Sequence, residues 1–317
     1  MRTDRDVSRP DDPHDAVGAK LRLLSLGQRV RGLLPRTIAV WIAERVGDIC
    51  WMVLRRHRRT IASNLLRTAA DRTPADRRRL CRATFRNFAV CLSDFLSLPR
   101  ATVPSILTLL TYEGLEHLDA AITRGRGAIL VTPHVGSPEF AGFLLASHGY
   151  RLHAVVENLP PALLERFNRF RSAGGVNLIR LGRAFEARAV IKRGEILGVL
   201  ADRAIGRGRS LAVGFAGGRR ILPIGPAALA LASGAPLLVA SIALDTTRPG
   251  HRYIGIIEPE ISTTDLGDQP AAQLTRRIAE RLSHHVTRYP DQWFVFQPDW
   301  LDHADVSTVP RQPGQYA

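Results

Sequence analysis

From about residue 105 onward, short apolar segments alternate along the chain with segments of helical length. The short segments are bounded by turn residues, which is typical of buried strands. This alternation predicts an α/β fold with a mixed, mostly parallel sheet flanked by helices. The predicted strands are 128–132, 151–156, 176–181, 196–201, 236–244 and 252–258, and the predicted helices are 115–124, 138–148, 160–173, 184–193, 224–233 and 270–288.

The stretch VTPHVGSPEF, residues 131–140, joins the first of these strands to the next helix. Ser137 is a favourable N-cap and Pro138 suits the first helical position, so His134 is predicted to lie on the loop between them. Glu139 falls in the first helical turn, where the helix dipole favours a negative charge. Sites in open α/β sheets form at the carboxyl ends of strands, which makes this loop a candidate site.

His134 and Glu139 are together suited to general-base chemistry. A histidine titrates near neutral pH and can take a proton from a hydroxyl as that hydroxyl attacks a thioester. A carboxylate at the other ring nitrogen would hold the tautomer and stabilise the imidazolium. The alternative is that His134 is a turn residue and Glu139 only a charge at a helix start.

An amphipathic helix is predicted over residues 36–54. Packing on the core is the more common role of the apolar stripe on such a helix, and insertion into a membrane interface is the alternative. Four arginines follow directly and would be attracted to anionic lipid in the second case. The stripe is Ile38, Ile42, Val46, Ile49 and Val53, with Trp41 and Met52 beside it, and the arginines are Arg55, Arg56, Arg58 and Arg59.

The chain divides into three parts on these grounds. Residues 1–34 are expected to be a mostly disordered or irregular basic segment, 35–104 a helical segment that could face a membrane, and 105–317 the α/β core. The uncharged stretch 221–244 is long enough to span a bilayer, but its prolines and Gly234 divide it, so we interpret it as buried core. His284 and His285 lie near the end of a predicted helix and are expected to be solvated.

The net charge of +15 predicts an anionic partner: nucleic acid, a phosphate-bearing ligand or a membrane surface. Residues 1–100 carry +11 of this charge, with 21 Arg and Lys against 10 Asp and Glu. The chain contains no helix-turn-helix, RNP or zinc-finger pattern, which argues against nucleic acid. No nucleophile elbow, phosphate-binding loop or metal-ligand spacing is present, so neither a metal nor a cofactor is expected. The three cysteines lack a C-x-x-C spacing and indicate a reducing compartment.

Several segments, taken in order, resemble one family. RGRGAILVTPHVGSPEFAG resembles the active-site segment of the lysophospholipid acyltransferase superfamily, in the branch of the bacterial lipid A biosynthesis and phosphatidylinositol mannoside acyltransferases. The resemblance covers roughly residues 35–300. Ser137-Pro138 and Ala204 depart from the family pattern and bear on the substrate more than on the reaction. The supporting segments are LADRAIGRGRSLAVGFAGG, GPAALALASGAPLLVASI and YPDQWFVFQPDW.

The resemblance implies transfer of an acyl chain from acyl-CoA or acyl carrier protein to a hydroxyl of a membrane glycolipid or phospholipid precursor. It implies no cofactor, and it places the enzyme peripherally on the cytoplasmic face of the plasma membrane. By its place in the pattern, Arg171 would bind phosphate or help to hold the donor, and a solvated helix charge is the alternative. Asp202 and Arg203 end a strand at the same predicted sheet edge as His134. Arg203 is a candidate to bind an anion, and an Asp202–Arg203 pair that holds the loop is the alternative.

Three other functions remain open from the sequence. The acceptor could be a lysophospholipid or another lipid. The basic charge is compatible with a nucleic-acid-binding protein. The chain could also be an inactive scaffold that keeps the fold. Thioester turnover that depends on His134 separates the enzyme from the last two.

Overall fold

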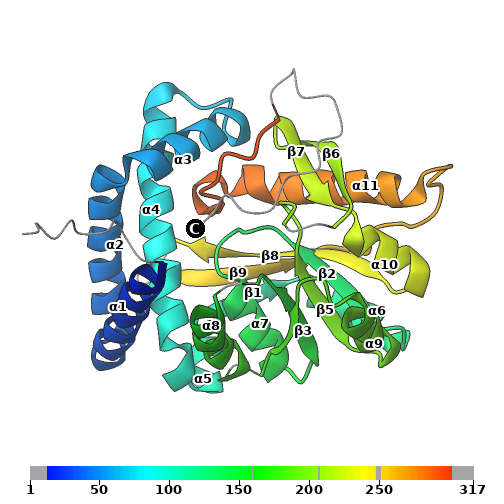
Figure 1. Ribbon diagram of the computed structural model, residues 1–317, viewed down its shortest axis with the longest axis horizontal. Helices are drawn as coiled ribbons and strands as arrows, with labels where there is room; N and C mark the ends of the chain where they lie inside the picture. Colours follow the sequence, from blue (N-terminus) through cyan, green and yellow to red (C-terminus); the bar gives the residue numbers. More distant parts are fainter. Residues whose placement is uncertain (1–12, 159, 174, 206–207, 248–250, 302–317) are drawn as a thin grey trace, which may run out of the picture.

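A seven-stranded sheet forms the centre of the computed structural model, which describes residues 13–158, 160–173, 175–205, 208–247 and 251–301 (Figure 1). The strand order is β1-β9-β8-β2-β5-β3-β4, and every neighbouring pair is parallel except β8 with β9. The predicted mixed, mostly parallel sheet is therefore confirmed. The strands are β1 (Leu110–Glu113), β2 (Ala128–Thr132), β3 (Leu152–Val156), β4 (Asn177–Arg180), β5 (Ile196–Leu200), β8 (Leu237–Asp245) and β9 (Arg252–Ile257).

Helices cover both faces of the sheet because successive strand side chains point to opposite sides. Ile129 and Val131 of β2 join a buried cluster with α9 (Ala184–Lys192), α10 (Gly225–Ser233) and α11 (Pro270–Arg288). Ala128 and Leu130 of the same strand join a second cluster with α6 (Leu115–Thr123) and α7 (Pro138–Ser147). The uncharged stretch 221–244 runs through the end of β7 (Gly218–Pro223), α10 and β8. No helix in the described part of the chain is both long and apolar enough to cross a membrane.

The N-terminal helices pack beside the sheet, on the left of Figure 1. They are α1 (Pro13–Leu33), α2 (Arg36–Val53), α3 (Arg55–Thr68), α4 (Pro74–Ser97) and α5 (Val103–Leu107), and α8 (Pro161–Ala173) follows β3. The expectation of an irregular segment over 1–34 is wrong for residues 13–33, which form α1, whereas residues 1–12 lie outside the described residues.

A buried carboxylate joins these helices to the sheet. Asp94 of α4 is 1% exposed and accepts hydrogen bonds from Arg36 of α2 at 2.7 Å and from Tyr253 of β9 at 2.9 Å. Arg31 of α1 also lies within 3.6 Å of this carboxylate. A buried charge needs such partners, so this network fixes α1, α2 and α4 on the sheet.

The apolar stripe of α2 faces outward. Ile38, Trp41 and Ile49 are 47%, 60% and 54% exposed, and Val46, Met52 and Val53 are exposed as well. The buried face of α2 consists instead of Ala39, Val40, Ala43, Gly47 and Asp48. The expectation that the stripe packs on the core is therefore wrong.

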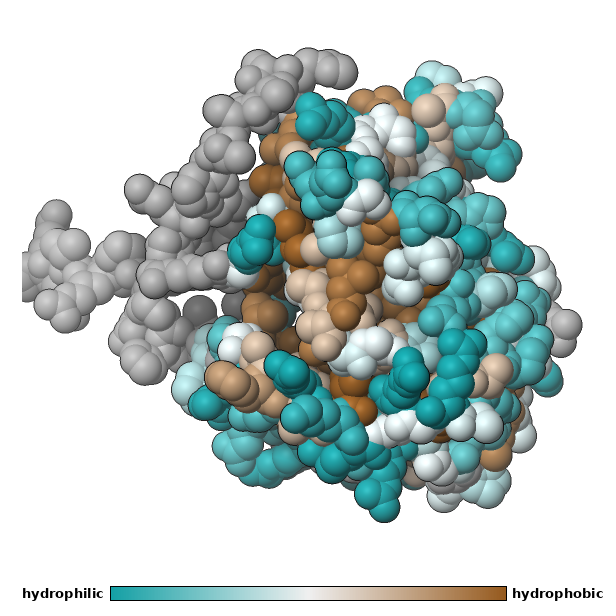
Figure 2. All heavy atoms as spheres, turned by 90° about the vertical axis from the view of Figure 1, so that its right-hand side faces the viewer, coloured by the Kyte–Doolittle hydropathy of each residue, from teal (hydrophilic) through white to brown (hydrophobic). Residues whose placement is uncertain are grey.

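Most of the large apolar side chains that are exposed lie on the N-terminal helices. Among the described residues, large apolar side chains that are exposed lie almost entirely between Leu26 and Leu107, and Phe185 is the exception. The opposite side of the molecule is shown in Figure 2, where hydrophilic residues surround an apolar band. Because Phe185 is the one large exposed apolar side chain beyond Leu107 in the described chain, this band consists mainly of small or partly covered residues.

Two further features bear on the site. The antiparallel hairpin of β6 (Ser210–Phe215) and β7 (Gly218–Pro223) packs against α11. His285 of α11 is 1% exposed, with its Nδ1 atom 2.7 Å from Ser241 Oγ and its Nε2 atom 2.9 Å from Glu258 Oε1. The expectation that His285 is solvated is therefore wrong, because the helix turns this residue towards the sheet and leaves His284 exposed.

Candidate active site

The loop after β2 holds His134 at the carboxyl edge of the sheet. Gly136 allows the loop to turn there, with a positive φ of 61°. A Cβ atom at this position would lie 1.9 Å from the carbonyl oxygen of Ile242 in β8, so only glycine fits. Helix α7 then begins at Pro138, as the sequence predicts.

Asp202 lies directly beside His134, because β2 and β5 are neighbouring parallel strands. Thr132 is paired with Leu200, so the two strands end level with each other and the residues after them share one edge. Asp202 Oδ1 is 2.5 Å from His134 Nδ1, and Asp202 Oδ2 accepts a hydrogen bond of 2.9 Å from the His134 backbone N–H. The sequence predicted the shared edge, and the structure adds the contact.

A third hydrogen bond to this carboxylate comes from the C-terminal part of the described chain. Trp293 is 1% exposed, and its indole Nε1–H donates to Asp202 Oδ2 at 2.7 Å. The following residue, Phe294, donates its backbone N–H to the carbonyl oxygen of His134 at 2.8 Å. The segment after α11 therefore fixes both the His134 backbone and its carboxylate partner.

The guanidinium of Arg220 lies over the Trp293 ring. Its Cζ atom is 4.9 Å from the ring centroid of Trp293 and 5.0 Å from that of Trp300. Arg220 is 1% exposed, and its charge also lies 3.5 Å from the carboxylate of Asp299. A cation stacked on the indole in a buried site restrains the ring that donates to Asp202.

The surroundings of Asp202 determine its charge. Complete burial by itself would raise the pKa of this carboxyl, but its attraction to the His134 imidazole when protonated and the hydrogen bonds from His134 and Trp293 outweigh burial. The pKa of Asp202 therefore lies well below its ordinary value. An ionised carboxylate can only accept hydrogen bonds, so the proton in the short contact belongs to Nδ1 of His134.

This tautomer defines what the histidine can do. With Nδ1 protonated and bonded to Asp202, the Nε2 atom of a neutral ring carries the lone pair. The side chain of His134 retains 18% exposure. The pair thus has the arrangement of a general base with an orienting carboxylate, without a nucleophile of its own.

Glu139 lies in the first turn of α7, half-buried. It lines an apolar cavity between α7 and the sheet, together with Thr132 at the end of β2. The rest of the lining comes mainly from apolar residues of α7, β3 and β5, such as Leu145, Val156 and Val199. An orienting carboxylate acts at Nδ1 of the histidine ring, and in His134 this nitrogen is already bonded to Asp202. The role of Glu139 as orienting partner stays a prediction.

Arg203 and Asp202 follow one another in sequence but have separate partners. The guanidinium of Arg203 bonds the carboxylate of Glu157 and, at 2.5 Å, the Oε1 atom of Gln297. The structure thus links Arg203 to the segments after β3 and α11, and Asp202 to His134. Arg171 lies in α8, and its side chain is outside the described residues.

No group of three or more His, Cys, Asp and Glu side chains is arranged to hold a metal ion in the described ranges.

The model of one protein family, the bacterial lipid A biosynthesis acyltransferases, matches residues 23–302. The chain belongs to this family. It is 30% identical over 260 residues to the phosphatidylinositol mannoside acyltransferase of Mycolicibacterium smegmatis. This match covers 80% of this chain and 81% of that protein. It is 32% identical over 204 residues to the protein of the same name from Mycobacterium tuberculosis, and the match covers 62% of this chain. The chain spans about three fifths, 61%, of the length of that relative.

Two residues of the site in this family member were not found from the sequence. Trp293 lies in an apolar and aromatic segment, and nothing in its neighbourhood points to a carboxylate 91 positions earlier. Arg220 is one of many arginines in the chain, and only its burial distinguishes it. The signal that could have found Trp293 is the segment YPDQWFVFQPDW, which supports the family resemblance.

Proposed function

We propose that this protein transfers an acyl chain from a thioester donor, acyl-CoA or acyl carrier protein, to a hydroxyl of a membrane glycolipid or phospholipid precursor. The observation that carries the proposal is the contact of Asp202 with Nδ1 of His134 at a sheet edge, beside an apolar cavity. Membership of the acyltransferase family supports it.

The reaction needs one proton to move twice. The acceptor hydroxyl attacks the thioester carbonyl, and Nε2 of His134 takes its proton as the new C–O bond forms. When the C–S bond breaks, the imidazolium returns that proton to the leaving sulfur. Asp202 stays ionised and stabilises the imidazolium between these steps.

We further propose that the apolar cavity beside Glu139 receives the acyl chain. Its lining by Leu145, Val156 and Val199 offers an apolar environment, which an alkyl chain prefers to water. Thr132 and Glu139 in the lining stand at the end of β2 and the start of α7, on either side of the loop of His134, so the thioester end of a bound chain would lie near that loop. Glu139 would then act at this end of the cavity, either on the ring of His134 or on the substrate.

The acceptor is proposed to be a glycolipid, since two mycobacterial relatives are named phosphatidylinositol mannoside acyltransferases. Such a lipid carries a phosphate, and Arg171 and Arg203 are proposed to bind anionic groups of donor or acceptor. A lysophospholipid acceptor is the alternative within the same chemistry.

The enzyme is proposed to bind peripherally to the cytoplasmic face of the plasma membrane through α2. The outward stripe of Ile38, Trp41 and Ile49 supplies apolar area for an interface, and the arginines at the start of α3 would face anionic lipid. Nucleic acid is not proposed as a partner.

Two measurements test the reaction and the acceptor. Release of free thiol from an acyl-CoA, or from an acylated carrier protein, should require His134, and folded His134→Ala should lose ~10²–10⁴-fold in rate. Unchanged turnover by folded His134→Ala would remove the proposal. Mass spectrometry of lipids from a deletion strain should show loss of one acyl chain from a glycolipid, and loss from a lysophospholipid product instead would favour the alternative acceptor.

A further inference from the structure

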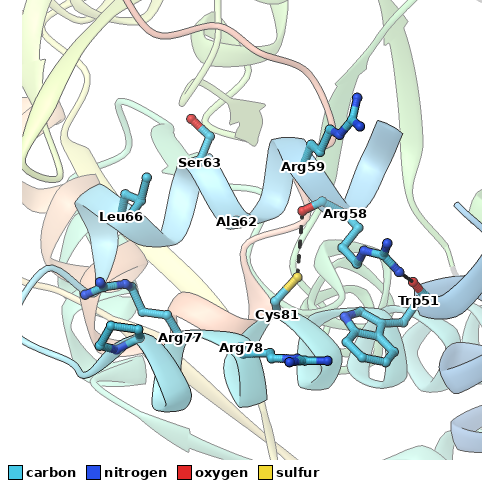
Figure 3. A pocket seen from close by; sticks show the side chains of 10 residues that line it. Trp51, Arg58, Arg59, Ala62, Ser63, Leu66, Arg77, Arg78 and Cys81 are labelled. Atoms are coloured by element: carbon cyan, nitrogen blue, oxygen red, sulfur yellow. Dashed lines mark hydrogen bonds between the residues drawn. The ribbon is translucent and has the colours of Figure 1, made fainter. Parts of the chain in front are cut away.

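A second concave site lies between α3 and the first half of α4 (Figure 3). It is a cavity of about 700 Å³. Four arginines line it, Arg58 and Arg59 from α3 and Arg77 and Arg78 from α4. In the close-up, the guanidinium of Arg58 lies near the indole of Trp51, Arg77 and Arg78 extend from α4, and Arg59 points away from them on the other side of α3.

Among the described residues, no carboxylate lines this cavity to balance its positive charge. Arg58 bonds the carbonyl oxygen of Trp51 at 2.8 Å, and Arg77 bonds the carbonyl oxygen of Ala70 at 3.4 Å, so both donate to neutral groups. Four like charges around a cavity repel one another and would attract an anion.

The nearest carboxylates of α2 and α4 have other partners. Asp48 accepts hydrogen bonds from Arg86 at 2.6 Å and from Arg82 at 2.7 Å, and these hydrogen bonds, with the charges of both arginines, lower the pKa of Asp48. Asp76 lies 3.1 Å from Arg79. These two carboxylates therefore do not neutralise the four arginines that line the cavity, whose charges can act on a ligand.

The remaining lining is apolar and aromatic. It comprises Ala62, Leu66, Pro74 and Cys81, with Trp51 at one end, and Ser63 as a neutral hydroxyl. Guanidinium groups bind phosphate oxygens bidentately, and an apolar lining suits the uncharged body that carries the phosphate. The chemistry is thus that of a phosphate ester attached to an apolar or planar group.

We propose that this cavity binds the phosphate headgroup of an anionic membrane lipid. Trp51 connects it to the apolar stripe of α2, because Met52 and Val53 follow Trp51 in the last turn and are 55% and 64% exposed. Arg58 also donates to the carbonyl oxygen of Met52 at 3.2 Å, which fixes the start of α3 against the end of α2. A bilayer in contact with the stripe would therefore bring its headgroups to the arginines.

This inference rests on the proposed membrane contact of α2, and it adds a defined lipid site to it. The site is separate from His134, because a buried cluster that includes Ile61, Leu65 and Phe85, with Phe296 packed on it, lies beneath α3 and α4. Substitutions of exposed arginines in the cavity should consequently leave the catalytic loop unchanged.

The test compares two pairs of substitutions with the same loss of charge. Arg59→Gln with Arg78→Gln removes one exposed arginine from each wall of the cavity, and Arg55→Gln with Arg56→Gln removes two exposed arginines outside the lining. Binding is measured by co-sedimentation with phosphatidylcholine vesicles that contain or lack phosphatidylglycerol. We expect the cavity pair to weaken binding to the anionic vesicles on the order of a hundredfold and the control pair about tenfold or less, since each direct charged contact is worth about tenfold.

Equal losses in the two pairs would show that charge acts diffusely and would overturn the lipid site. Adenosine 3′,5′-bisphosphate is the second probe, because the nucleotide end of acyl-CoA shares the chemistry of a phosphate on a planar body. Binding of this nucleotide that is lost in the cavity pair, with vesicle binding unchanged, would overturn the lipid assignment in favour of the donor. Thiol release with a glycolipid acceptor dispersed in detergent, without vesicles, is measured in parallel: it should persist in both pairs, and its absence from the unaltered protein would refute the acyltransferase proposal alone.

Discussion

Replacement of Asp202 by Asn tests the orientation of His134 most directly. The carboxylate accepts three hydrogen bonds, at 2.5 Å from His134 Nδ1, 2.9 Å from the His134 backbone N–H and 2.7 Å from Trp293 Nε1. An amide of the same shape has one oxygen and one NH₂ group, so it cannot accept all three. If the NH₂ group faces the ring, Nδ1 must become the acceptor, and Nε2 then carries the hydrogen and cannot act as a base.

The size of the effect follows from the loss of the base. A positioned acid–base group contributes typically ~10²–10⁴-fold to the rate, and the wrong tautomer removes that contribution. The stability cost should be smaller, because one donor left without a partner in a buried site costs about 1–3 kcal/mol. Asp202→Asn should therefore fold and lose most of its turnover, whereas Asp202→Ala would leave more donors unpaired.

The assay is thiol release at saturating donor, with circular dichroism to verify folding. Glu139→Gln is the matched variant, because it makes the same chemical change in the other candidate carboxylate. If Asp202 orients the base, its variant should lose at least ten times more activity than Glu139→Gln. A folded Asp202→Asn that keeps near-normal turnover, beside an inactive Glu139→Gln, would refute the assignment and return the orienting role to Glu139.

Asp202 also predicts a dependence of stability on pH. Its pKa in the folded protein lies below the ordinary value of 3.8. The stabilisation from its ionised form is therefore complete above about that value, and it is lost as the pH falls towards the lower pKa of the folded state. Thermal unfolding of Asp202→Asn should show a weaker loss of stability below pH 4 than the unaltered protein, and parallel curves would contradict the lowered pKa.

Three further substitutions have defined outcomes. Trp293→Phe removes one hydrogen bond to a buried carboxylate, which is worth about 1.5–3 kcal/mol. It should lower both thermal stability and thiol release, and full activity of this variant would contradict the role of Trp293. Asp94→Ala removes the carboxylate that the partly buried guanidinium of Arg36 bonds and should cost about 3–5 kcal/mol in urea unfolding, and a change below 1 kcal/mol would contradict the network. Gly136→Ala forces a Cβ to within 1.9 Å of a carbonyl oxygen and should yield little folded protein, whereas normal expression and melting would show that the loop has room.

The α/β part of the fold could be predicted because each strand and helix there is long enough to show its own pattern. The first four residues of strand β2 are buried, and α11 shows an apolar face over 19 residues. Strand β1 was missed for the opposite reason. It has four residues, of which only Leu110 is buried, so it lacks any apolar run. Its place in the sheet depends on pairing with β9, which is far away in sequence.

The edge of the sheet that holds the site could also be predicted, but the pairing within it could not. Strand ends in a parallel sheet share an edge whichever strands are neighbours, so His134 and Asp202 were expected at the same edge. Their contact requires β5 to lie next to β2, although α7, β3, α8, β4 and α9 intervene in sequence. Glu139 was the nearer carboxylate along the chain, and sequence distance is a poor measure of contact where a sheet brings distant strands together.

The orientation of α2 shows that packing can bury the less apolar face of an amphipathic helix. The large residues Ile38 and Ile49 form the more apolar face, which is normally the buried one. The opposite face contains Ala43 and Gly47, and a Cβ atom on Gly47 would lie only 2.6 Å from the Cα atom of Arg86 in α4. Small residues let α2 and α4 approach this closely, and the contact also brings Asp48 within 2.6 Å of Arg86. The small face is therefore the packed one, and the large apolar residues are left at the surface, where the proposed membrane contact would use them.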